Sequence, residues 1–379
     1  MNPERIILPA LCMAHSHAFQ RAMRGQAQRP PNNSSGHPGS FWSWREQMYA
    51  LAHSLTPETI YDMSRTAYAE LRACGVRTVG EFHYVHHQAD GMPYADRTIL
   101  ADAVVRAALD EGLRIALLRV AYERGGAGRS VEGVQHRFCD PSVDAVLRDV
   151  DTLRAKYANH DRVRIGVAPH SVRAVSREWL ESLSAYANEH DLPLHMHVAE
   201  QPREIDQCLK ESGRRPLELL ADIGALTHRF VAVHATHLKL HEAKLLGDAR
   251  AFACICPTTE RDLGDGLPNI KALREAGVKL CVGVDSHVVS DPLEEIRSLE
   301  THERLRSLSR VTFNAGSRSP AEQLWLEGSQ MGAMACGFSD EGETISLDPD
   351  HLELRLTDPE HRLDAIVFGC TKAFLFSHR

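Results

Sequence analysis

The amino-acid sequence predicts an α/β protein with a (β/α)8, TIM-type barrel. Eight short apolar segments, mostly separated by amphipathic helical segments, follow one another over about 280 residues, the size of such a barrel. Apolar strands that alternate with helices indicate a parallel sheet buried on both faces. A doubly wound open sheet is the alternative. We favour the barrel because the first strand leads into His15-Ser16-His17 and not into a Gly-x-Gly phosphate-binding turn.

Composition and turn residues place the individual elements. Gly75 and Gly112 each follow a helical segment, and Thr56-Pro57 supplies a cap residue and a first-turn proline for a helix. The expected strands are residues 8–14, 76–82, 114–122, 163–168, 192–198, 230–235, 251–256 and 279–284. The expected helices between them are residues 56–74, 101–111, 142–157, 177–189, 216–223, 241–246 and 269–275.

A long connection separates the first expected strand from the first expected helix, from about residue 19 to residue 56. Residues 29–39 are loop by composition, because Pro, Asn, Ser and Gly dominate them. The aromatic cluster at 41–46 follows and carries a cation, Arg45. Long loops of compact domains often form lids or binding loops, so we expect this segment to reach a functional site.

The end of the chain changes character. Residues 294–306 and 320–334 are expected helices, whereas 345–347, 352–354 and 365–368 are short strand-like pieces among Asp, Pro and Gly. We therefore expect a barrel over residues 1–335 and a small C-terminal β appendage over residues 336–379.

Composition excludes several classes of function. The net charge of −8 indicates no basic surface for nucleic acid or an anionic membrane. Nine cysteines without a C-x-x-C pair are typical of reduced thiols in the cytoplasm. The apolar residues 6–14 faintly resemble a signal peptide, but Glu4 and Pro9 interrupt that pattern, and we expect a buried strand there. No apolar run approaches the roughly 18 residues of a membrane helix.

Polar residues gather at the ends of five expected strands. The carboxyl ends of barrel strands form one mouth, where catalytic residues collect. These polar ends are His15 and His17, His170 to Arg173, His195 to Glu200, His234 to His237, and Asp285 to His287. Their accumulation at one edge predicts an active site.

The residue types at this mouth suit a metal ion. His15 and His17 lie on the same face of a strand, because side chains at i and i+2 point the same way. Three imidazoles and one carboxylate suit Zn²⁺, with water completing the site. A carboxylate must then exchange protons with that water, and Asp285 and Glu200 are candidates. Glu200 is three residues from His197, so it must lie just beyond the strand end.

The motifs of this mouth resemble those of the mononuclear deaminases of the amidohydrolase superfamily, and within it the formimidoylglutamate deiminases of histidine degradation. The matching motifs are H-S-H-A-F-Q-R-A-M at 15–23, F-W-S-W-R-E at 41–46, G-E-F-H-Y-V-H-H at 80–87, A-P-H-S-V-R-A-V at 168–175, H-M-H-V-A-E-Q at 195–201, V-H-A-T-H at 233–237, C-P-T-T-E at 256–260, L-G-D-G at 263–266 and G-V-D-S at 283–286. The resemblance covers residues 8–335, most of the chain.

The resemblance implies a barrel of the metal-dependent hydrolase type that deaminates N-formimidoyl-L-glutamate to N-formyl-L-glutamate and ammonia. It implies one Zn²⁺ per chain held by His15, His17, His197 and Asp285. It implies that Asp285 and His234 help to deprotonate the attacking water and that Glu200 carries a proton to the leaving amine. It implies that Gln20, Arg45, Tyr84, His170 and Arg173 bind the substrate. A homodimer is the family-level expectation.

Two observations sharpen these expectations. No lysine occurs in residues 163–170, where two-metal barrel hydrolases commonly carry a modified lysine, so one metal is favoured. The substrate is a dicarboxylate, and Arg45 and Arg173 present the forked guanidinium groups that bind carboxylates in pairs of hydrogen bonds. His195 and His237 are expected to be structural.

Alternatives stay open. A related deaminase acting on a purine or pterin ring would share the metal site but need aromatic stacking. A truncated, inactive metal-binding remnant is the non-enzymatic alternative. The chain also departs from the family, because the β-strands that usually precede the barrel are largely missing and residues 369–376 do not resemble the usual final strands. Exposed sheet edges are expected in the appendage as a result.

Overall fold

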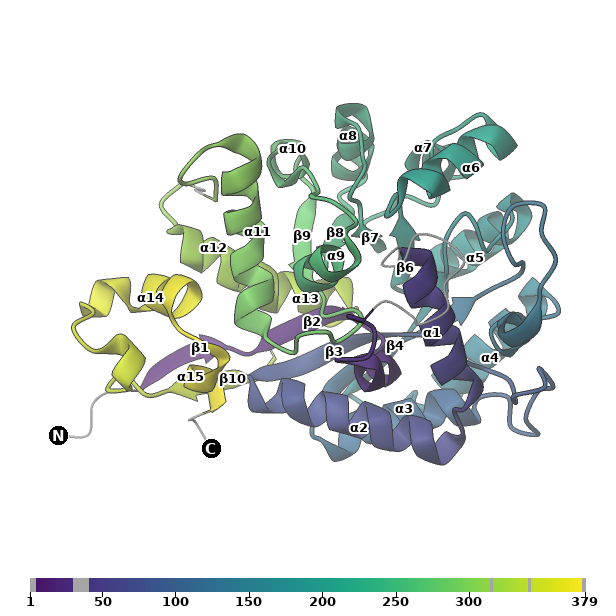
Figure 1. The fold of residues 1–379 in the computed structure, drawn as a ribbon, viewed down its shortest axis with the longest axis horizontal. Coiled ribbons are helices and arrows are strands. Elements are labelled where there is room, and N and C mark those ends of the chain that lie inside the picture. Colours follow the sequence, from purple (N-terminus) through teal and green to yellow (C-terminus); the bar gives the residue numbers. More distant parts are fainter. Residues whose placement is uncertain (1–4, 30–40, 314–315, 340–341, 377–379) are drawn as a thin grey trace.

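The computed structural model describes residues 5–29, 41–313, 316–339 and 342–376, and its centre is a parallel sheet of eight strands in chain order (Figure 1). Every residue of β4 is buried, as expected for a strand covered on both faces. The strands are β2 (Leu11–Ser16), β3 (Val76–His83), β4 (Arg114–Ala121), β5 (Val163–Pro169), β6 (Leu194–Val198), β7 (Phe230–His234), β8 (Phe252–Ile255) and β9 (Lys279–Val282).

Backbone hydrogen bonds join the first strand of this sheet to the segment after the last one. The amide groups of Val284 and Asp285 both donate to the carbonyl of His15, over 3.0 and 3.1 Å, and the amide of His17 donates to the carbonyl of Asp285 over 2.8 Å. Gly283 permits this approach, because a Cβ there would lie 2.6 Å from Cβ of His15. The predicted barrel is therefore confirmed.

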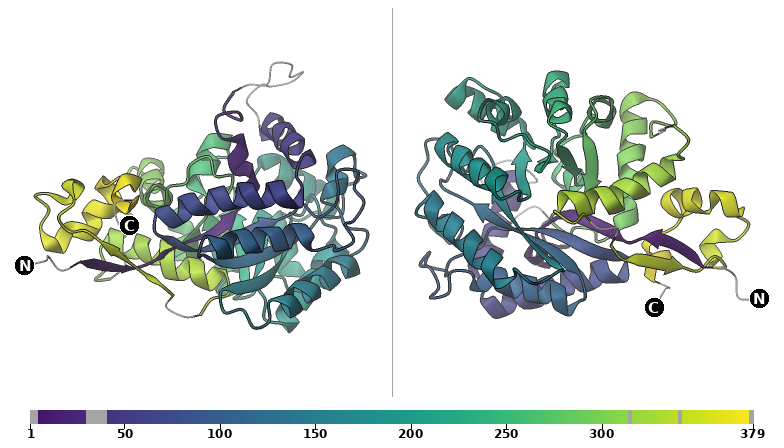
Figure 2. Two further views of the ribbon diagram at one scale, coloured as in Figure 1. Left: turned by 90° about the horizontal axis from the view of Figure 1, so that it is seen from below. Right: turned by 180° about the vertical axis from the view of Figure 1, so that it is seen from behind.

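Helices surround the barrel on its outer side (Figure 2). Each of the seven predicted helices forms, and α6 and α9 are additional. The helices that follow the strands are α2 (Pro57–Ala73), α3 (Ile99–Asp110), α4 (Val143–Lys156), α5 (Arg177–Glu189), α6 (Pro202–Ser212), α7 (Pro216–Asp222), α8 (Leu240–Asp248), α9 (Pro257–Leu263), α10 (Ile270–Glu275) and α11 (Pro292–Ser307). None of the helices in the described ranges is long and apolar enough to cross a membrane.

The long connection between residues 19 and 56 contains helical structure that the sequence analysis did not predict. A short 3₁₀ helix, η1, spans Ala18–Met23, and α1 spans Phe41–His53. Tertiary contacts stabilise the end of α1, because the Arg137 guanidinium donates to the carbonyls of Ala52, His53 and Leu55. The partner lies more than 80 residues away, so local composition could not reveal it. Residues 30–40 lie outside the described residues.

The C-terminal region contains fewer strands than predicted. Residues 345–347 belong to β10 (Thr344–Leu347), which pairs antiparallel with β1 (Ile6–Pro9). Residues 352–354 form a 3₁₀ helix, and residues 365–368 lie in α14 (Arg362–Gly369), so both strand predictions are wrong. Arg297 of α11 donates to the carbonyls of Val367 and Cys370, which holds this end of α14 beside the barrel.

The 3₁₀ helix η2 (Gly133–Arg137) lies between β4 and α4, and further helices lie between α11 and the end of the described chain. These further helices are α12 (Pro320–Leu326), a π-helical turn η3 (Glu327–Met331), α13 (Gly332–Ala335), η5 (Pro359–His361) and α15 (Lys372–Phe376). Just beyond α13, Cys336 and Phe338 pack in one buried cluster with Cys12, Cys254 and other barrel residues. The division of the chain at residue 335 stays a prediction.

Candidate active site

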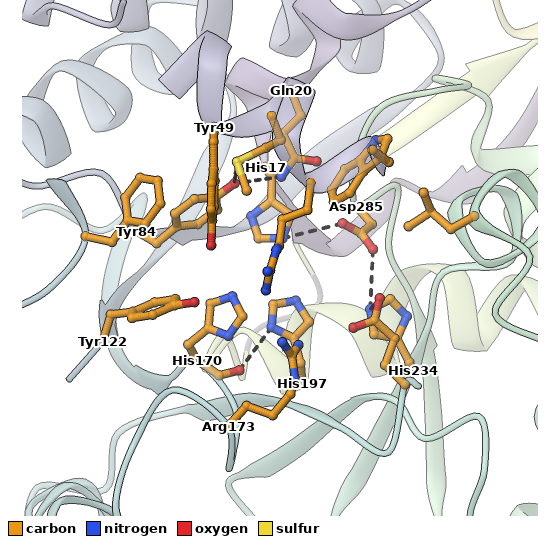
Figure 3. Close-up of a pocket in the computed structure, with 16 residues that line it drawn as sticks. His17, Gln20, Tyr49, Tyr84, Tyr122, His170, Arg173, His197, His234 and Asp285 are labelled. Atoms are coloured by element: carbon orange, nitrogen blue, oxygen red, sulfur yellow. Dashed lines mark hydrogen bonds and ion pairs between the residues drawn. The ribbon is translucent and has the colours of Figure 1, made fainter. Parts of the chain in front are cut away.

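A cavity of about 580 Å³ opens at the carboxyl ends of the barrel strands (Figure 3). Ten of the eleven predicted site residues line it, and they come from the ends of six strands and from η1 and α1. The predicted residues that line it are His17, Gln20, Arg45, Tyr84, His170, Arg173, His197, Glu200, His234 and Asp285. The eleventh, His15, is fully buried directly behind His197, with 3.2 Å between their Nε2 atoms.

The four predicted metal ligands converge. The Nε2 atoms of His15 and His17 lie 3.9 and 3.4 Å from Oδ1 of Asp285. Two ligand atoms of a tetrahedral zinc ion lie about 3.3 Å apart, because each is about 2.0 Å from the metal. His15, His17 and His197 also form a buried group whose spacing suits a metal ion. The donor set therefore fits a divalent cation of the zinc type.

Hydrogen bonds and burial hold these imidazoles in the state that binds a metal. Nδ1 of His17 lies 3.0 Å from the carbonyl of Phe82, and Nδ1 of His197 lies 3.0 Å from the carbonyl of His170. A proton on each Nδ1 leaves the Nε2 lone pair facing the cavity. Burial lowers the pKa of His17 to about 3 and lowers the pKa of His197 well below its ordinary value, so both rings stay neutral.

Carboxylates surround His234 on the opposite side of the site. Its Nε2 lies 3.4 Å from Oδ2 of Asp285 and 3.9 Å from Oε1 of Glu200, and its Nδ1 lies 3.2 Å from Oε1 of Glu260. Burial alone would lower the pKa of His234, but these three carboxylates raise it to about 10. Burial, together with the charge of Glu200, raises the pKa of Asp265 to about 9. Groups with shifted pKa values are thus concentrated around Asp285, one of the predicted metal ligands.

The cavity is also lined by hydrogen-bonding and cationic groups. The side-chain amide of Gln20 donates to the hydroxyl of Tyr84 over 2.8 Å, while Oε1 of Gln20 has no partner among the described residues. The guanidinium of Arg45 lies 5.4 Å from the ring centre of Tyr49. Arg173 is only 8% exposed, and it extends towards the pocket centre in Figure 3. Guanidinium groups of this kind are suited to carboxylate ligands.

Strained backbone positions the residues that follow the strands. His234 and Asp285 have φ values of 68° and 48°, and Ala199, directly before Glu200, has a φ of 53°. Residues other than glycine rarely adopt this left-handed conformation, and it costs about 1–3 kcal/mol at each position. The surrounding barrel holds these turns, and they aim His234, Asp285 and Glu200 into the cavity.

A buried polar network braces the His-x-His pair from outside the cavity. The hydroxyl of Ser16 donates to Glu81 over 2.6 Å and lies 2.8 Å from Nε2 of His287. The second oxygen of Glu81 accepts from the amide of Ala18 over 2.8 Å. The network joins β2, β3 and the segment after β9, and so fixes the two strand ends that carry three of the four predicted ligands.

Sequence reasoning missed several residues of the site. Six further residues line the cavity, most of them aromatic: Trp44, Met48, Tyr49, Tyr122, Phe138 and Leu263. Glu260 and Asp265 lie in motifs that the sequence analysis matched, but neither was given a role. One local signal was the spacing of four residues between Cys256 and Glu260 at the start of α9. The Glu260 carboxylate accepts a hydrogen bond from the backbone amide of Cys256 there. His195 and His237 each lie 2.9 Å from a backbone carbonyl oxygen, as expected for structural residues.

Comparison with known proteins defines the class. The model of the amidohydrolase family matches residues 6–346, and the chain belongs to this family. Formimidoylglutamate deiminase of Pseudomonas aeruginosa is 40% identical over 307 residues, which make up 80% of this chain and 66% of the relative. The chain thus spans slightly less than two thirds of that relative's length. The 8-oxoguanine deaminase of the same species is 29% identical over 342 residues, 89% of this chain and 71% of the relative.

Solved structures agree on the fold. An amidohydrolase from Brucella melitensis superposes with a TM-score of 0.88 at 35% identity and covers 96% of this chain and 81% of its own. An adenosine deaminase from Xanthomonas campestris with bound zinc has a TM-score of 0.80 at 21% identity and covers 98% of this chain and 78% of its own.

Proposed function

We propose that this protein is a zinc-dependent hydrolase that deaminates N-formimidoyl-L-glutamate to N-formyl-L-glutamate and ammonia, a step of histidine degradation. One observation carries the proposal. A single cavity is lined both by a buried cluster of His and Asp side chains with the spacing of a metal site and by the arginines Arg45 and Arg173. The 40% identity to a formimidoylglutamate deiminase over 80% of this chain supports the same substrate.

The proposal assigns one Zn²⁺ per chain to His15, His17, His197 and Asp285. Their converging atoms and neutral imidazoles support this assignment. When bound, the ion would lower the pKa of a coordinated water towards about 7, so that a nucleophile forms at neutral pH. The chain itself supplies the positions of the proton-exchanging groups and of the substrate.

The proposed proton path runs through three side chains. Asp285 accepts a proton from the attacking water, and His234, which lies 3.4 Å from Asp285 and is kept protonated by its carboxylate neighbours, helps by orienting and polarising that water. Glu200, whose Oε1 lies 3.9 Å from Nε2 of His234, delivers a proton to the amine nitrogen of the substrate. The formimidoyl carbon gains a C–O bond and loses its C–N bond to the departing ammonia, so that the formyl group remains.

The proposed substrate pose follows from charge. Arg45 and Arg173 pair with the carboxylates of the substrate, and Gln20, Tyr84 and His170 hold the part of the molecule between the carboxylates and the metal. The free acceptor of Gln20 and the Tyr84 hydroxyl support hydrogen bonds to the amidine nitrogens. This pose holds the reacting carbon beside Glu200 and Asp285. Binding of the carboxylates thus orients the substrate for the reaction.

A comparison of substrates tests the proposal. The zinc-loaded protein should release ammonia from N-formimidoyl-L-glutamate and not from guanine, 8-oxoguanine or adenosine. Ammonia release from a purine instead would establish the second candidate, a ring deaminase. That candidate is favoured by the aromatic lining of Trp44, Tyr49, Tyr122 and Phe138 and by the 29% identical 8-oxoguanine deaminase. A protein with bound zinc that releases ammonia from none of these would be the inactive remnant.

The proposal also includes a cytoplasmic location, a homodimer and no nucleic-acid partner. All nine cysteines are free thiols, which supports a reducing compartment. The net charge of −8 disfavours polyanionic partners.

A further inference from the structure

A second cavity, of about 630 Å³, adjoins the active site. We call it the arginine vestibule, and define it by Arg45, Tyr122, Arg129, Arg173, Arg203 and Gln207. Arg45, Tyr122 and Arg173 line both cavities, so the vestibule lies directly beside the active site. These three side chains can therefore contact a ligand from either cavity.

The vestibule concentrates positive charge on a chain of net charge −8. Four of the residues that line it are arginines, and no Asp or Glu is among the described residues that line it. Arg203 and Gln207 lie four residues apart on α6 and so share one face of that helix. A cleft of one charge sign focuses the electrostatic field and raises the local concentration of ligands of opposite charge.

The arginines of the vestibule lie at different depths, from the protein surface to its interior. Arg129 and Arg203 are exposed, whereas Arg173 is buried at the junction of the two cavities. Within the described part of the chain, no residue accepts a hydrogen bond from Nε of Arg173. A buried guanidinium donor without an acceptor is costly, and a ligand carboxylate would satisfy it.

We propose that the arginine vestibule admits dianionic substrates and binds their distal carboxylate, with Arg129 and Arg203 as specificity-determining residues. This inference rests on the proposed function, because that function supplies a dicarboxylate substrate. The exposed Arg129 and Arg203 attract the dianion and favour it over a monoanion. Arg45 and Arg173, deeper in the protein, hold it during the reaction.

The test compares Arg129→Gln, Arg203→Gln and the double variant with Arg148→Gln, which removes an exposed arginine of α4 that lies in neither cavity. For N-formimidoyl-L-glutamate, kcat/KM of the double variant should fall about tenfold and depend less on salt, while kcat stays within about twofold. Arg203→Lys should keep most of kcat/KM because it keeps the charge. Unchanged kcat/KM and salt dependence in the double variant would overturn the proposal.

Calorimetric binding of two unreactive probes separates this proposal from the proposed function. The zinc-loaded protein should bind glutarate more tightly than butyrate, and the double variant should lose about tenfold of that preference with butyrate binding unchanged. If the protein does not deaminate formimidoylglutamate but shows this preference, the function fails and the vestibule stands. If deamination is normal and the double variant keeps its full preference for glutarate, the vestibule alone is refuted.

Discussion

At the scale of single residues, the main feature of this site is the placement of three carboxylates around one histidine. His234 lies among Glu200, Glu260 and Asp285, and its raised pKa follows from these neighbours. The sequence contained every one of these residues. Their mutual distances depend on the left-handed backbone conformation of Ala199, His234 and Asp285. Non-glycine residues rarely adopt this conformation, so the sequence did not predict it.

Replacement of Glu200 tests the proposed proton path. Glu200→Gln keeps the size of the side chain but removes the ionisable group, so turnover should drop about 10²-fold or more. Zinc content, measured by elemental analysis, should stay at its original value because Glu200 is not a proposed ligand. Retained turnover would remove Glu200 from the mechanism, and His17→Asn serves as a control that should lose zinc as well as activity.

At the scale of elements, two ion pairs connect the segment after the His-x-His motif to the outer helix α2. Arg21 and Arg24 of the η1 region both donate to the Glu70 carboxylate, and Arg24 also donates to the carbonyl of His287 over 2.9 Å. These contacts hold η1, and with it Gln20, against the barrel. Sequence periodicity placed α2 correctly but gave no indication of this tie.

Acid should weaken this tie. Burial alone would raise the pKa of Glu70, but hydrogen bonds from Arg21 and Arg24 lower it to about 2. The contribution of this carboxylate to stability is therefore complete above its unfolded pKa of about 4.5 and is lost as the pH falls towards 2. The unfolding free-energy difference between wild type and Glu70→Gln, measured with denaturant, should shrink over this range. A difference that stays constant with pH would contradict the ion-pair explanation.

The end of α11 contains an avoidable strain. Leu308 caps this helix with a φ of 52° and is 92% exposed, so its side chain contributes little packing. Leu308→Gly should raise the free energy of unfolding by about 1 kcal/mol, because glycine adopts this conformation without a steric penalty. Leu305→Gly, at an exposed position inside the same helix, should instead lower it by about 1 kcal/mol. Thermal denaturation of the two variants measures whether the free energy of unfolding rises in the first and falls in the second.

At the scale of the whole molecule, the proposed metal ligands lie across the place where the barrel closes. His15 and His17 end β2, Asp285 follows β9, and His197 belongs to β6 on the opposite wall. Backbone hydrogen bonds and the Ser16–Glu81–His287 network join β2 to the segment after β9. A bound ion would cross-link these segments and strengthen the closure.

Removal of zinc should therefore lower global stability as well as activity. A ligand that binds only the folded state stabilises it by about 2.7 kcal/mol at a hundredfold excess over its Kd. The midpoint of thermal unfolding should fall by several degrees after chelation and return when zinc is added back. The chelator should leave the midpoint of His17→Asn almost unchanged. An equal fall in both proteins would show that the chelator acts elsewhere.

The sequence by itself determined the barrel and which strand ends meet at its mouth. Alternating strands and helices predict a parallel sheet, and the carboxyl ends of parallel strands must meet, so the polar strand ends that contain His15, His197, His234 and Asp285 could be assigned to one site from their order. The choice of His197 over His195 as a predicted ligand came from the resemblance to a family. Tertiary structure decided what depends on distant partners. The helix α1 forms against Arg137, the C-terminal pieces fold as helices beside α11, and Arg129 and Arg203 meet at the vestibule. Local patterns record the preferences of a segment, whereas these features depend on contacts between segments far apart in the chain.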